Sequence, residues 1–503
     1  MTINLQASLA TKIVKMLINP YYNCIYGRVN RTLFVIQYKG EWKFMWNPKI
    51  IDTDKVLYIA IADAIERDIR LGILKQNEKM PPQRSLAKTI GVNLTTITRA
   101  YKEAEKRGLI TGTIGRGTYV SDDKKDRILP EILGSEDEII ELGLVGSIKI
   151  EGYDLSKQLK AVAKGHVLDS LLDYVPSQGI RRHREVAAGW IKQYGLNADC
   201  EHIVICAGAM HAINCCLLGL FDPGDRIAVD MLTFTGFKNA AQLNRMKLEP
   251  IVMDSEGMVP EHLEEQCKKH QIKGIYLMPN LQNPTATEMS KKRKREIADI
   301  ILKYGLILIE DDIYNFMNVT NKTALSTLVP DNGVYICSIS KSLFPGLRIA
   351  FASVPQRFLY KFNQAVTNTV WMAPTISSEL VTQFIESGTA AEMINQKKLV
   401  IENRIQLAKT VLRDYSFQAI EGSPFLWLNL PEGWNCAEFE NTALMNHVRV
   451  ISAYKFYVGT QLPPNAVRVS LGSVENDEQM QKGLHILLRI LKQYPILASS
   501  FLI

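Results

Sequence analysis

An eleven-residue stretch, Ser338 to Arg348, constrains the fold and chemistry of this chain more than any other. It places Lys341 between serine hydroxyls, with an arginine seven residues further on. A lysine amine can condense with the aldehyde of pyridoxal 5'-phosphate (PLP), Arg348 can bind the phosphate dianion bidentately, and Ser338 and Ser340 can donate to it. The motif alone is moderately specific, because a surface lysine near an arginine explains it about equally well.

An acidic loop upstream strengthens the PLP interpretation. It follows an apolar strand predicted over residues 305–309. Open α/β sheets bind ligands at the carboxyl ends of their strands. Asp311 is therefore placed to keep the pyridine nitrogen protonated, which makes the ring an electron sink. Tyr314, three residues on, is placed to reach the phenolic oxygen of the ring.

Other turns after predicted strands offer contacts to the same cofactor. Asn283 follows a strand predicted over residues 274–278 and offers a donor to the phenolic oxygen, although a polar turn bounded by prolines is the simpler interpretation. Gly208 and Ala209 open a predicted helix, whose free N–H groups and positive end would face a phosphate. Phe234 would stack on the pyridine face, and an ordinary core aromatic is nearly as good an account of it.

From about residue 139 to the C-terminus, the chain resembles a fold-type I, class I/II aminotransferase. The resemblance implies an α/β fold with a mainly parallel sheet, PLP as cofactor and an obligate homodimer. It also implies that Arg468 holds the α-carboxylate of a substrate or effector, and that Tyr174 reaches the phosphate of the neighbouring subunit. The sequence departs from the common family pattern at Ala207, Phe234 and Ala286. The family's functional residues fall on Asn283, Asp311, Tyr314, Lys341 and Arg348.

The chain has room for a second domain, because an enzyme of this class needs roughly 350 to 400 residues and this chain has 503. Apolar periodicity predicts a helix over residues 58–71, followed by a short helix that ends at Gly91. Asn93 is placed to cap a further helix over residues 94–107, whose apolar face, which includes Ile97 and Tyr101, is predicted to be buried. Two helices joined by a glycine turn are the layout of a helix-turn-helix.

Residues 109–120 alternate like a small hairpin with Arg116 at its tip, which makes the predicted motif a winged one. Arg116 is suited to a minor groove, and Arg84 to phosphates or base edges in the major groove. Singly, each of these residues is better explained as a solvated side chain, but as a set they favour DNA. The segment resembles the GntR-type winged helix, with Leu94 where that family often has arginine. The candidate contacts on the second helix are Thr95, Thr96, Thr98 and Arg99.

Charge supports this division of the chain. Residues 55–121, the predicted winged helix, hold 12 Lys and Arg against 6 Asp and Glu. Residues 122–503 hold 40 against 43. Positive charge is therefore concentrated where DNA contact is predicted, as counterion release requires. Within the longer part, residues 122–138 are predicted to be a charged linker and residues 139–503 the aminotransferase-like domain.

Residues 1–54 match no pattern that we recognise. Met45 begins a Met-Trp-Asn-Pro stretch. Such a stretch commonly opens regulators that combine a winged helix with an aminotransferase-like domain. We therefore interpret residues 1–44 as the product of a misassigned start, with an atypical N-terminal arm as the alternative. The apolar stretch over residues 33–38 is too short to span a membrane. The eight cysteines form no C-x-x-C pair, which predicts reduced thiols, no metal site and a cytoplasmic location.

A GntR-type winged helix fused to an aminotransferase-like domain resembles the MocR/GabR-type regulators. The resemblance implies a PLP-dependent transcription factor, a homodimer that binds double-stranded operator DNA. A small amine or amino acid would attack the aldimine at Lys341 and release the lysine, a local change that would bias the domain arrangement and so the DNA geometry. An active aminotransferase with an incidental DNA-binding module is the alternative, since the same residues would bind an amino acid for either purpose. The complete set of cofactor residues argues against a third possibility, a repressor that no longer holds PLP.

Overall fold

The structure is a computed structural model of the 503-residue chain. By its internal contacts the chain divides into two units, Met1–Ser135 and Glu136–Ile503, and each is described by itself. The structure describes residues 33–38, 41–46, 48, 56–71, 73–75, 78–106, 109–113, 117–120, 139–150, 152–153, 155–164, 168–317, 323–459 and 461–500. Within these ranges, no helix combines the length and the apolar character needed to cross a membrane.

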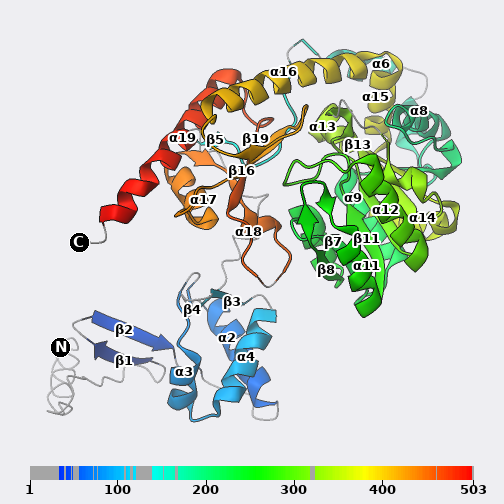
Figure 1. Ribbon diagram of the computed structural model, residues 1–503. Helices are drawn as coiled ribbons and strands as arrows, with labels where there is room; N and C mark the ends of the chain where they lie inside the picture. Colours follow the sequence, from blue (N-terminus) through cyan, green and yellow to red (C-terminus); the bar gives the residue numbers. More distant parts are fainter. Residues whose placement is uncertain are drawn as a thin grey trace, which may run out of the picture. The chain divides into compact units, whose positions relative to one another are not determined.

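The smaller unit contains helices and two antiparallel hairpins (Figure 1). The predicted helix-turn-helix with its wing is confirmed. The second hairpin pairs Ile110 with Val120 and Thr113 with Gly117. The elements are β1 (Leu33–Tyr38), β2 (Glu41–Trp46), α2 (Leu57–Arg70), α3 (Gln83–Ile90), α4 (Leu94–Lys106), β3 (Ile110–Thr113) and β4 (Gly117–Val120).

The core of this unit forms on the apolar faces that the sequence predicts. The face of α4 that carries Ile97 and Tyr101 is buried, and the Tyr101 hydroxyl donates to the carbonyl of Pro81 at 2.7 Å. Trp46 is buried in the same core, and its indole N–H donates to the buried carboxylate of Asp68 at 2.9 Å. Trp46 therefore packs as part of the winged-helix unit, although the sequence pattern left it unassigned.

The larger unit is built on a seven-stranded sheet in which neighbouring strands run parallel, except for β14, which runs antiparallel to both its neighbours. The predicted α/β fold with a mainly parallel sheet is confirmed. In sheet order, the strands are β6 (Ile203–Cys206), β14 (Ala350–Ser353), β13 (Gly333–Ser338), β12 (Ile307–Asp311), β11 (Ile272–Leu277), β7 (Arg226–Asp230) and β8 (Lys247–Ile251).

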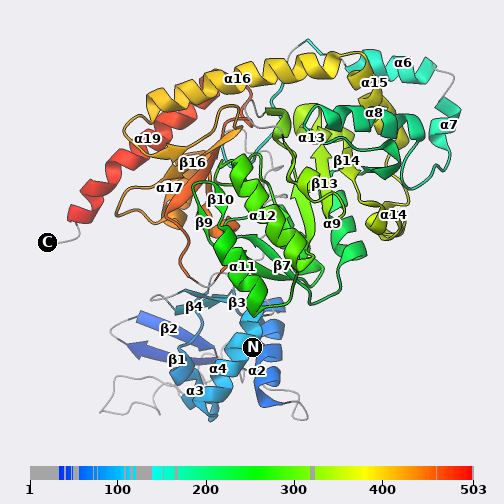
Figure 2. The ribbon, with the colours of Figure 1, turned by 45° about the vertical axis from the view of Figure 1, so that its right-hand side comes forward.

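Helices cover both faces of this sheet. On β12, Ile309 packs into the core beneath α9, α10 and α14, whereas Leu308 packs into the core beneath α11 and α12. Successive side chains of a strand point to opposite faces, so Asp311 shares the side of Ile309 and Glu310 the side of Leu308. Figure 2 shows α11 and α12 in front of the strands. These helices are α9 (Ala209–Leu220), α10 (Thr235–Leu243), α14 (Gln356–Val370), α11 (Pro260–Lys269) and α12 (Lys291–Tyr304).

A second, antiparallel sheet lies towards the C-terminal end of the chain, and the long helices α16 and α19 lie side by side next to it (Figures 1 and 2). At its side, β5 pairs in parallel with β17, so the segment of residues 139–150 starts there. The elements are β15 (Phe417–Gln418), β16 (Phe425–Asn429), β19 (Ala466–Ser470), β18 (Ile451–Ser452), β5 (Ile140–Glu141), β17 (Val448–Arg449), α16 (Thr389–Val411), α17 (Cys436–Met445), α18 (Ala453–Phe456) and α19 (Asp477–Ser500).

Short elements complete the larger unit and include α13, the turn of helix that carries Lys341. It follows directly after β13, at the carboxyl edge of the large sheet. The remaining elements are α6 (Leu155–Lys164), α7 (Leu168–Leu172), α8 (Arg181–Lys192), η1 (Cys200–His202), β9 (Met253–Asp254), β10 (Gly257–Met258), η2 (Asn315–Met317), η3 (Leu325–Leu328), α13 (Ile339–Ser342), η4 (Pro345–Leu347) and α15 (Thr375–Glu386).

Candidate cofactor and effector site

The predicted site residues of the larger unit come from the ends of neighbouring strands. Asp311 is the last residue of β12 and pairs in register with Ile336 of β13. The chain leaves β13 at Ser338 and enters α13, which carries Lys341. Parallel strands end at the same edge of a sheet, and such edges bind ligands in open α/β folds. The carboxylate and the amine therefore belong to one edge.

Asp311 is buried and only half satisfied. Its Oδ2 accepts a hydrogen bond from the Tyr276 hydroxyl at 2.8 Å, whereas its Oδ1 has no hydrogen-bond partner. The Tyr276 ring stacks on Phe237, with centroids 3.7 Å apart, which fixes the donor. Burial raises the pKa of Asp311 to about 6, against the opposing effects of the Tyr276 hydrogen bond and of the backbone N–H of Ile313. A positively charged donor next to Oδ1 would reverse this shift.

The neighbouring carboxylate, Glu310, is buried on the other side of β12 and is fully engaged. It accepts hydrogen bonds from the backbone N–H of Leu325 at 2.8 Å and of Ser326 at 2.7 Å. The Ser326 hydroxyl also donates to it, at 2.5 Å. Glu310 therefore anchors the start of η3, and it takes no part in the site that contains Asp311.

Lys341 lies beside a small cavity, and its amine donates to the backbone carbonyl of Val145. Burial lowers the pKa of Lys341 to about 8, and the positive charges of Arg468 and Arg348 act in the same direction. A larger fraction of the amine is thus unprotonated near neutral pH than for an exposed lysine. The other residues that line the cavity are Gly146, Ile148, Tyr314, Phe316, Met317, Lys397 and Pro424.

The predicted phosphate turn brings Gly208 against Arg348. Gly208 has a φ of 91° and directly precedes α9, and a Cβ placed on it would lie 2.3 Å from a guanidinium nitrogen of Arg348. Arg348 donates to the Ser340 hydroxyl at 3.0 Å, and the Ser338 hydroxyl accepts from the N–H of Ser340 at 3.2 Å. Ala209 begins α9, where backbone N–H groups lack helical acceptors. This cluster offers the donors that a phosphate dianion requires.

Arg468 is a buried cation held by neutral acceptors. Its guanidinium donates to the side-chain oxygen of Asn283 and to the carbonyl of Gly143, both at 2.6 Å. Its Nε has no hydrogen-bond partner, and its Cζ lies 4.8 Å from the ring centroid of Phe456. Burial lowers the pKa of Arg468 to about 10. A carboxylate ligand would supply a negatively charged hydrogen-bond acceptor, which the contacts to Asn283 and Gly143 do not.

The remaining predicted cofactor residues lie as follows. Tyr314 is buried and packs edge-on against Phe425, with centroids 5.5 Å apart. Phe234 precedes α10, and its ring fills the space that a side chain at Gly236 would occupy. Tyr174 is 84% exposed, so it makes no buried contact within its own chain. The roles predicted for these three aromatic residues stay predictions.

In the winged-helix unit, Arg84, Thr95 and Arg99 are exposed, whereas Thr96 and Thr98 are half-buried. The Thr98 hydroxyl donates to the side-chain oxygen of Gln83 at 2.8 Å, which joins α4 to α3. Thr98 thus has a structural contact that the pattern did not predict. Arg116, the predicted tip of the wing, lies outside the described residues.

Several residues that touch the site were missed by sequence reasoning. Tyr276 comes from the interior of a strand, where aromatic residues are ordinary core. Gly143, Val145 and Ser147 contribute through a segment without a distinctive motif. Lys397 lies in the middle of the long helix α16, 56 residues after Lys341. Only the spatial arrangement brings them to the site.

Comparison with known proteins identifies both units. The sequence profile of the family "Aminotransferase class I and II" matches residues 151–487, and that of "Bacterial regulatory proteins, gntR family" matches residues 57–120. The uncharacterized HTH-type transcriptional regulator YdeF of Bacillus subtilis is 34% identical over 451 residues, covering 90% of this chain and 98% of that protein. The similarity to YdeF therefore extends over both units.

Other relatives match mainly the larger unit. The 2-aminoadipate transaminase of Thermus thermophilus is 25% identical over 332 residues, which cover 64% of this chain and 82% of that protein. The crystal structure of an archaeal alanine:glyoxylate aminotransferase gives a TM-score of 0.66 at 25% identity and covers 74% of this chain and 94% of that one. These matches support the aminotransferase fold of the larger unit.

The chain belongs to the class I and II aminotransferase family and carries a gntR-family DNA-binding domain before its aminotransferase domain. It is a DNA-binding transcriptional regulator with an aminotransferase-like domain, so the predicted combination of modules is confirmed. Fold-type I aminotransferases depend on PLP, which makes PLP the cofactor of this domain, as predicted.

The side chains of the site fit PLP. The unpartnered oxygen of Asp311 suits a protonated pyridine nitrogen, and the amine of Lys341 suits the aldehyde. The turn at Gly208, with Arg348 and Ser340, suits the phosphate. When bound, PLP supplies the electron sink and the aldehyde, and the protein supplies orientation and charge.

Proposed function

We propose that this protein is a PLP-dependent transcriptional regulator that senses a small amine or amino acid by exchange at Lys341. The observation that carries the proposal is Arg468, a buried cation with only neutral hydrogen-bond acceptors, in the same unit as the Lys341 amine and in one chain with a DNA-binding domain. An amino acid offers both a carboxylate for the arginine and an amine to replace the lysine.

In this proposal each side chain has a separate task. Asp311 holds the proton on the pyridine nitrogen, and Asn283 and Tyr314 hold the phenolic oxygen. Arg348, Ser338, Ser340 and the N–H groups at Gly208 and Ala209 bind the phosphate, while Phe234 stacks on the ring. With PLP bound, the amine of an effector would replace that of Lys341 at the cofactor carbon and return the free lysine, and Arg468 would orient that effector by its carboxylate.

The proposal also includes a homodimer. Tyr174 and Trp371 are 84% and 57% exposed, and their ring centroids lie 5.8 Å apart. A pair of large exposed aromatic side chains favours an interface. We assign Tyr174 to the phosphate of the neighbouring subunit, and the two winged helices of the dimer to two half-sites of an operator.

For DNA contact, Arg84 and Arg99 are exposed, as phosphate and base contacts require. We assign base contacts to these arginines and to Thr95, Thr96 and Thr98, and the minor groove to Arg116. The hydrogen bond from Thr98 to Gln83 also joins α4 to α3.

Two similarities favour regulation over an aminotransferase with an incidental DNA module. The similarity to YdeF, which carries the name of a transcriptional regulator, covers 90% of the chain, whereas the similarity to the transaminase covers 64%. The complete set of PLP-type residues likewise argues against a repressor without cofactor.

The experiment that tests the proposal sequences the genomic DNA fragments bound by the full-length protein, with and without PLP, and then titrates the selected duplex in the presence of single amino acids and amines. We expect at least one of them to change both the visible absorption and the affinity for DNA, with slow turnover. If an amino acid and keto acid pair instead gives a kcat of about 1 to 10³ s⁻¹, and no ligand alters DNA binding, the aminotransferase alternative replaces the regulator.

A further inference from the structure

A buried lysine, Lys397, contacts the turn that carries Lys341. Lys397, on α16, is 1% exposed, and its ammonium donates to the Ser147 hydroxyl and to the carbonyl of Leu343, both at 2.8 Å. It also donates to the carbonyl of Lys341 itself at 3.2 Å. These three acceptors match the three donors of a lysine ammonium. Lys397 therefore holds the turn that carries Lys341 by its backbone.

The surroundings of Lys397 make the burial of its charged ammonium group energetically unfavourable. All three acceptors are neutral, and both burial and the charge of Lys341 lower the pKa of Lys397, to about 8. A hydrophobic side chain of similar length would avoid the penalty of burying a charge, and such replacements are often neutral or stabilising. Packing alone therefore does not account for an ammonium group at this position.

The Ser147 hydroxyl joins Lys397 to a third element of the site. It lies 3.1 Å from the carbonyl of Lys341 and 3.2 Å from that of Leu343, the same two carbonyls that Lys397 binds. Ser147 belongs to the segment of residues 139–150, which follows the predicted linker in the chain. The same segment gives the carbonyl of Gly143 to Arg468 and the carbonyl of Val145 to the Lys341 amine.

We propose that Lys397 is a positioning residue that locks the Lys341 turn to the segment of residues 139–150, so that exchange at Lys341 is transmitted to this segment. The inference rests on the proposed function. When an effector amine replaces the lysine, the freed amine of Lys341 donates to the carbonyl of Val145. Lys397 keeps the turn in place, and this hydrogen bond, which the structure shows for the free amine, therefore tightens the segment that continues into the linker.

The test uses methoxyamine as the probe, because it attacks any accessible Schiff base of PLP and requires no knowledge of the effector. Its nitrogen forms the new C=N bond to the cofactor carbon, and the bond from that carbon to the Lys341 nitrogen breaks, which returns the lysine amine. Absorbance follows this reaction. Hydrogen exchange by mass spectrometry follows residues 139–150 in the full-length, PLP-loaded protein before and after the reaction.

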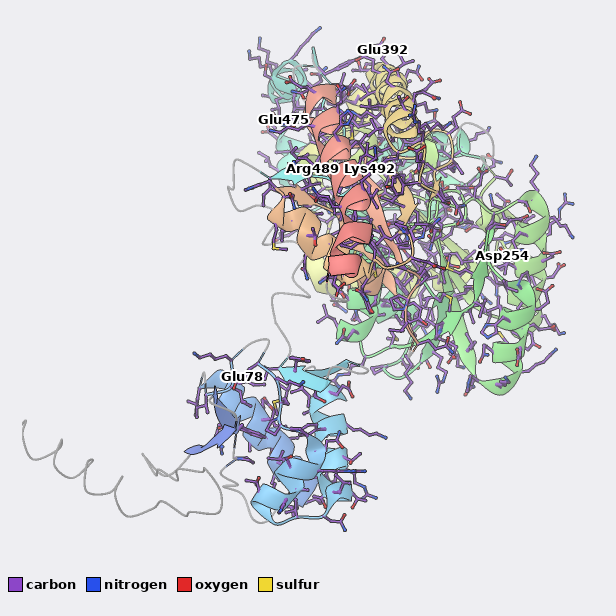
Figure 3. The ribbon with its side chains drawn as sticks, turned by 60° about the vertical axis from the view of Figure 1, so that its left-hand side comes forward. Glu78, Asp254, Glu392, Glu475, Arg489 and Lys492 are labelled. Carbon is purple, nitrogen blue, oxygen red and sulfur yellow. The ribbon has the colours of Figure 1, made fainter. Side chains whose placement is uncertain are left out.

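The variants are Lys397→Met, Lys397→Arg and Lys149→Met. Lys149→Met is the matched control, because Lys149 lies in the same segment but makes an exposed ion pair with Glu475, at 2.7 Å (Figure 3 labels Glu475). Exposed pairs of this kind contribute little to stability. Lys397→Arg retains the charge and the donors, and it should restore the behaviour of the wild type in part.

In the wild type, we expect methoxyamine to slow exchange in residues 143–147. In Lys397→Met, exchange there should be about tenfold faster than in the wild type, the change expected for the loss of a hydrogen bond to a charged group, and the probe should cause no slowing. Lys149→Met should respond like the wild type. Equal slowing in Lys397→Met and wild type, with the oxime formed in both, would overturn the inference and leave the proposed function intact.

Two controls keep the failures separate. If methoxyamine produces no oxime in the wild type, the proposed exchange at Lys341 fails, and the inference fails with it. If Lys397→Met does not fold, as thermal unfolding would reveal, Ser147→Ala decides the question, because it removes the other contact to the same carbonyls. It should lessen the slowing by methoxyamine, and an unchanged response in this variant would contradict the inference.

Discussion

The two sides of strand β12 hold adjacent buried carboxylates in opposite states. On one side, Glu310 accepts three hydrogen bonds and anchors η3. On the other, Asp311 has one partnered oxygen and one without a partner. Buried polar groups are nearly always satisfied, and an exception needs an explanation. The comparison separates a structural side of the sheet from a side that is built to bind a ligand.

Two lysines, one on each side, extend the comparison. Lys294, on the side of Glu310, donates to the side-chain oxygen of Asn280 at 2.6 Å and to the carbonyl of Thr323 at 2.9 Å. Lys341 lies beside a cavity and is assigned to the cofactor. The carboxylates of Glu310 and Asp312 raise the pKa of Lys294 against its burial, whereas the charges of Arg468 and Arg348 lower the pKa of Lys341 further. We therefore expect Lys294 to act as a structural hydrogen-bond donor and Lys341 to form the covalent bond to PLP.

The largest expected effect comes from the lysines. Lys341→Ala should abolish the covalent attachment of PLP after borohydride reduction, because no other amine is assigned to the aldehyde. Lys294→Met should retain the attachment while lowering the melting temperature, since it removes a buried donor from a satisfied network. Mass spectrometry of the reduced protein measures the attachment in both variants, and thermal unfolding measures the melting temperature. Labelling of another lysine in Lys341→Ala would contradict the assignment.

The second largest effect is expected from the two carboxylates, whose replacement should change different properties of the protein. Asp311→Asn should weaken PLP binding roughly 10- to 100-fold, because a charge-assisted hydrogen bond to the pyridine nitrogen contributes about 1.5 to 3 kcal/mol. Glu310→Gln should lower the free energy of unfolding by about 1 to 3 kcal/mol with little change in PLP affinity. Fluorescence titration with PLP and denaturant unfolding separate the two, and equal losses of PLP affinity would mean that the two sides are not distinct.

Arg468 sharpens the ligand-binding side further. Arg468→Leu should reduce the affinity for an amino acid roughly 10-fold or more, since a hydrogen bond to a charged group contributes about 1.5 to 3 kcal/mol. The affinity for the corresponding amine, which lacks the carboxylate, should stay unchanged. Spectral titration with L-alanine and with ethylamine tests this. A parallel loss for both ligands would assign Arg468 to the architecture of the site instead of to carboxylate binding.

On the winged-helix unit, Arg84→Ala and Arg99→Ala should each cost about 1 to 3 kcal/mol of operator binding if they contact bases. Fluorescence anisotropy at a fixed salt concentration measures the loss. Lys79→Ala is the control for operator affinity, because Lys79 is exposed but is not assigned to a base, and its amine lies over the Tyr119 ring, 5.7 Å from the centroid. We expect this variant to lose less operator affinity than either arginine variant. Operator affinity that is unchanged in both arginine variants would remove the assignment of these residues.

The smallest effect is a shift in pH dependence. The Lys341 amine attacks an aldehyde only when unprotonated, and its pKa is lowered to about 8 by burial and by nearby arginines. The rate at which the apoprotein takes up PLP should therefore rise with pH and level off above about 8, where the amine is already deprotonated. Stopped-flow absorbance measures this rate, and a rise that continues to about 10.4, the ordinary lysine value, would contradict the shift.

Sequence reasoning was most informative where a motif has fixed spacing. The periodicity of α4 predicted the burial of Ile97 and Tyr101, and the three strand ends predicted the sheet edge of the site. It could not find Lys397 or Ser147, because no local pattern distinguishes a buried lysine in a long helix from an exposed one. Contacts between segments so far apart in the chain depend on packing, which a single sequence does not display.

The partners of Asp311 show the same limit. Its place at the end of a strand was readable, whereas the donation from Tyr276 depends on the pairing of β11 with β12. Likewise, the position of Trp46 in the winged-helix core follows from its hydrogen bond to Asp68 and not from its neighbours in the chain. Residue type and spacing predict which groups are able to act, and packing decides which of them are left without partners.

The central claim is that chemistry at Lys341 controls DNA binding. The most direct measurement is the operator affinity of the full-length, PLP-loaded protein, taken with and without an amino acid that changes its visible absorption, in the wild type and in Lys341→Ala. We predict that the ligand changes the affinity of the wild type and leaves that of Lys341→Ala unchanged. An equal response of both proteins to the ligand would contradict the account.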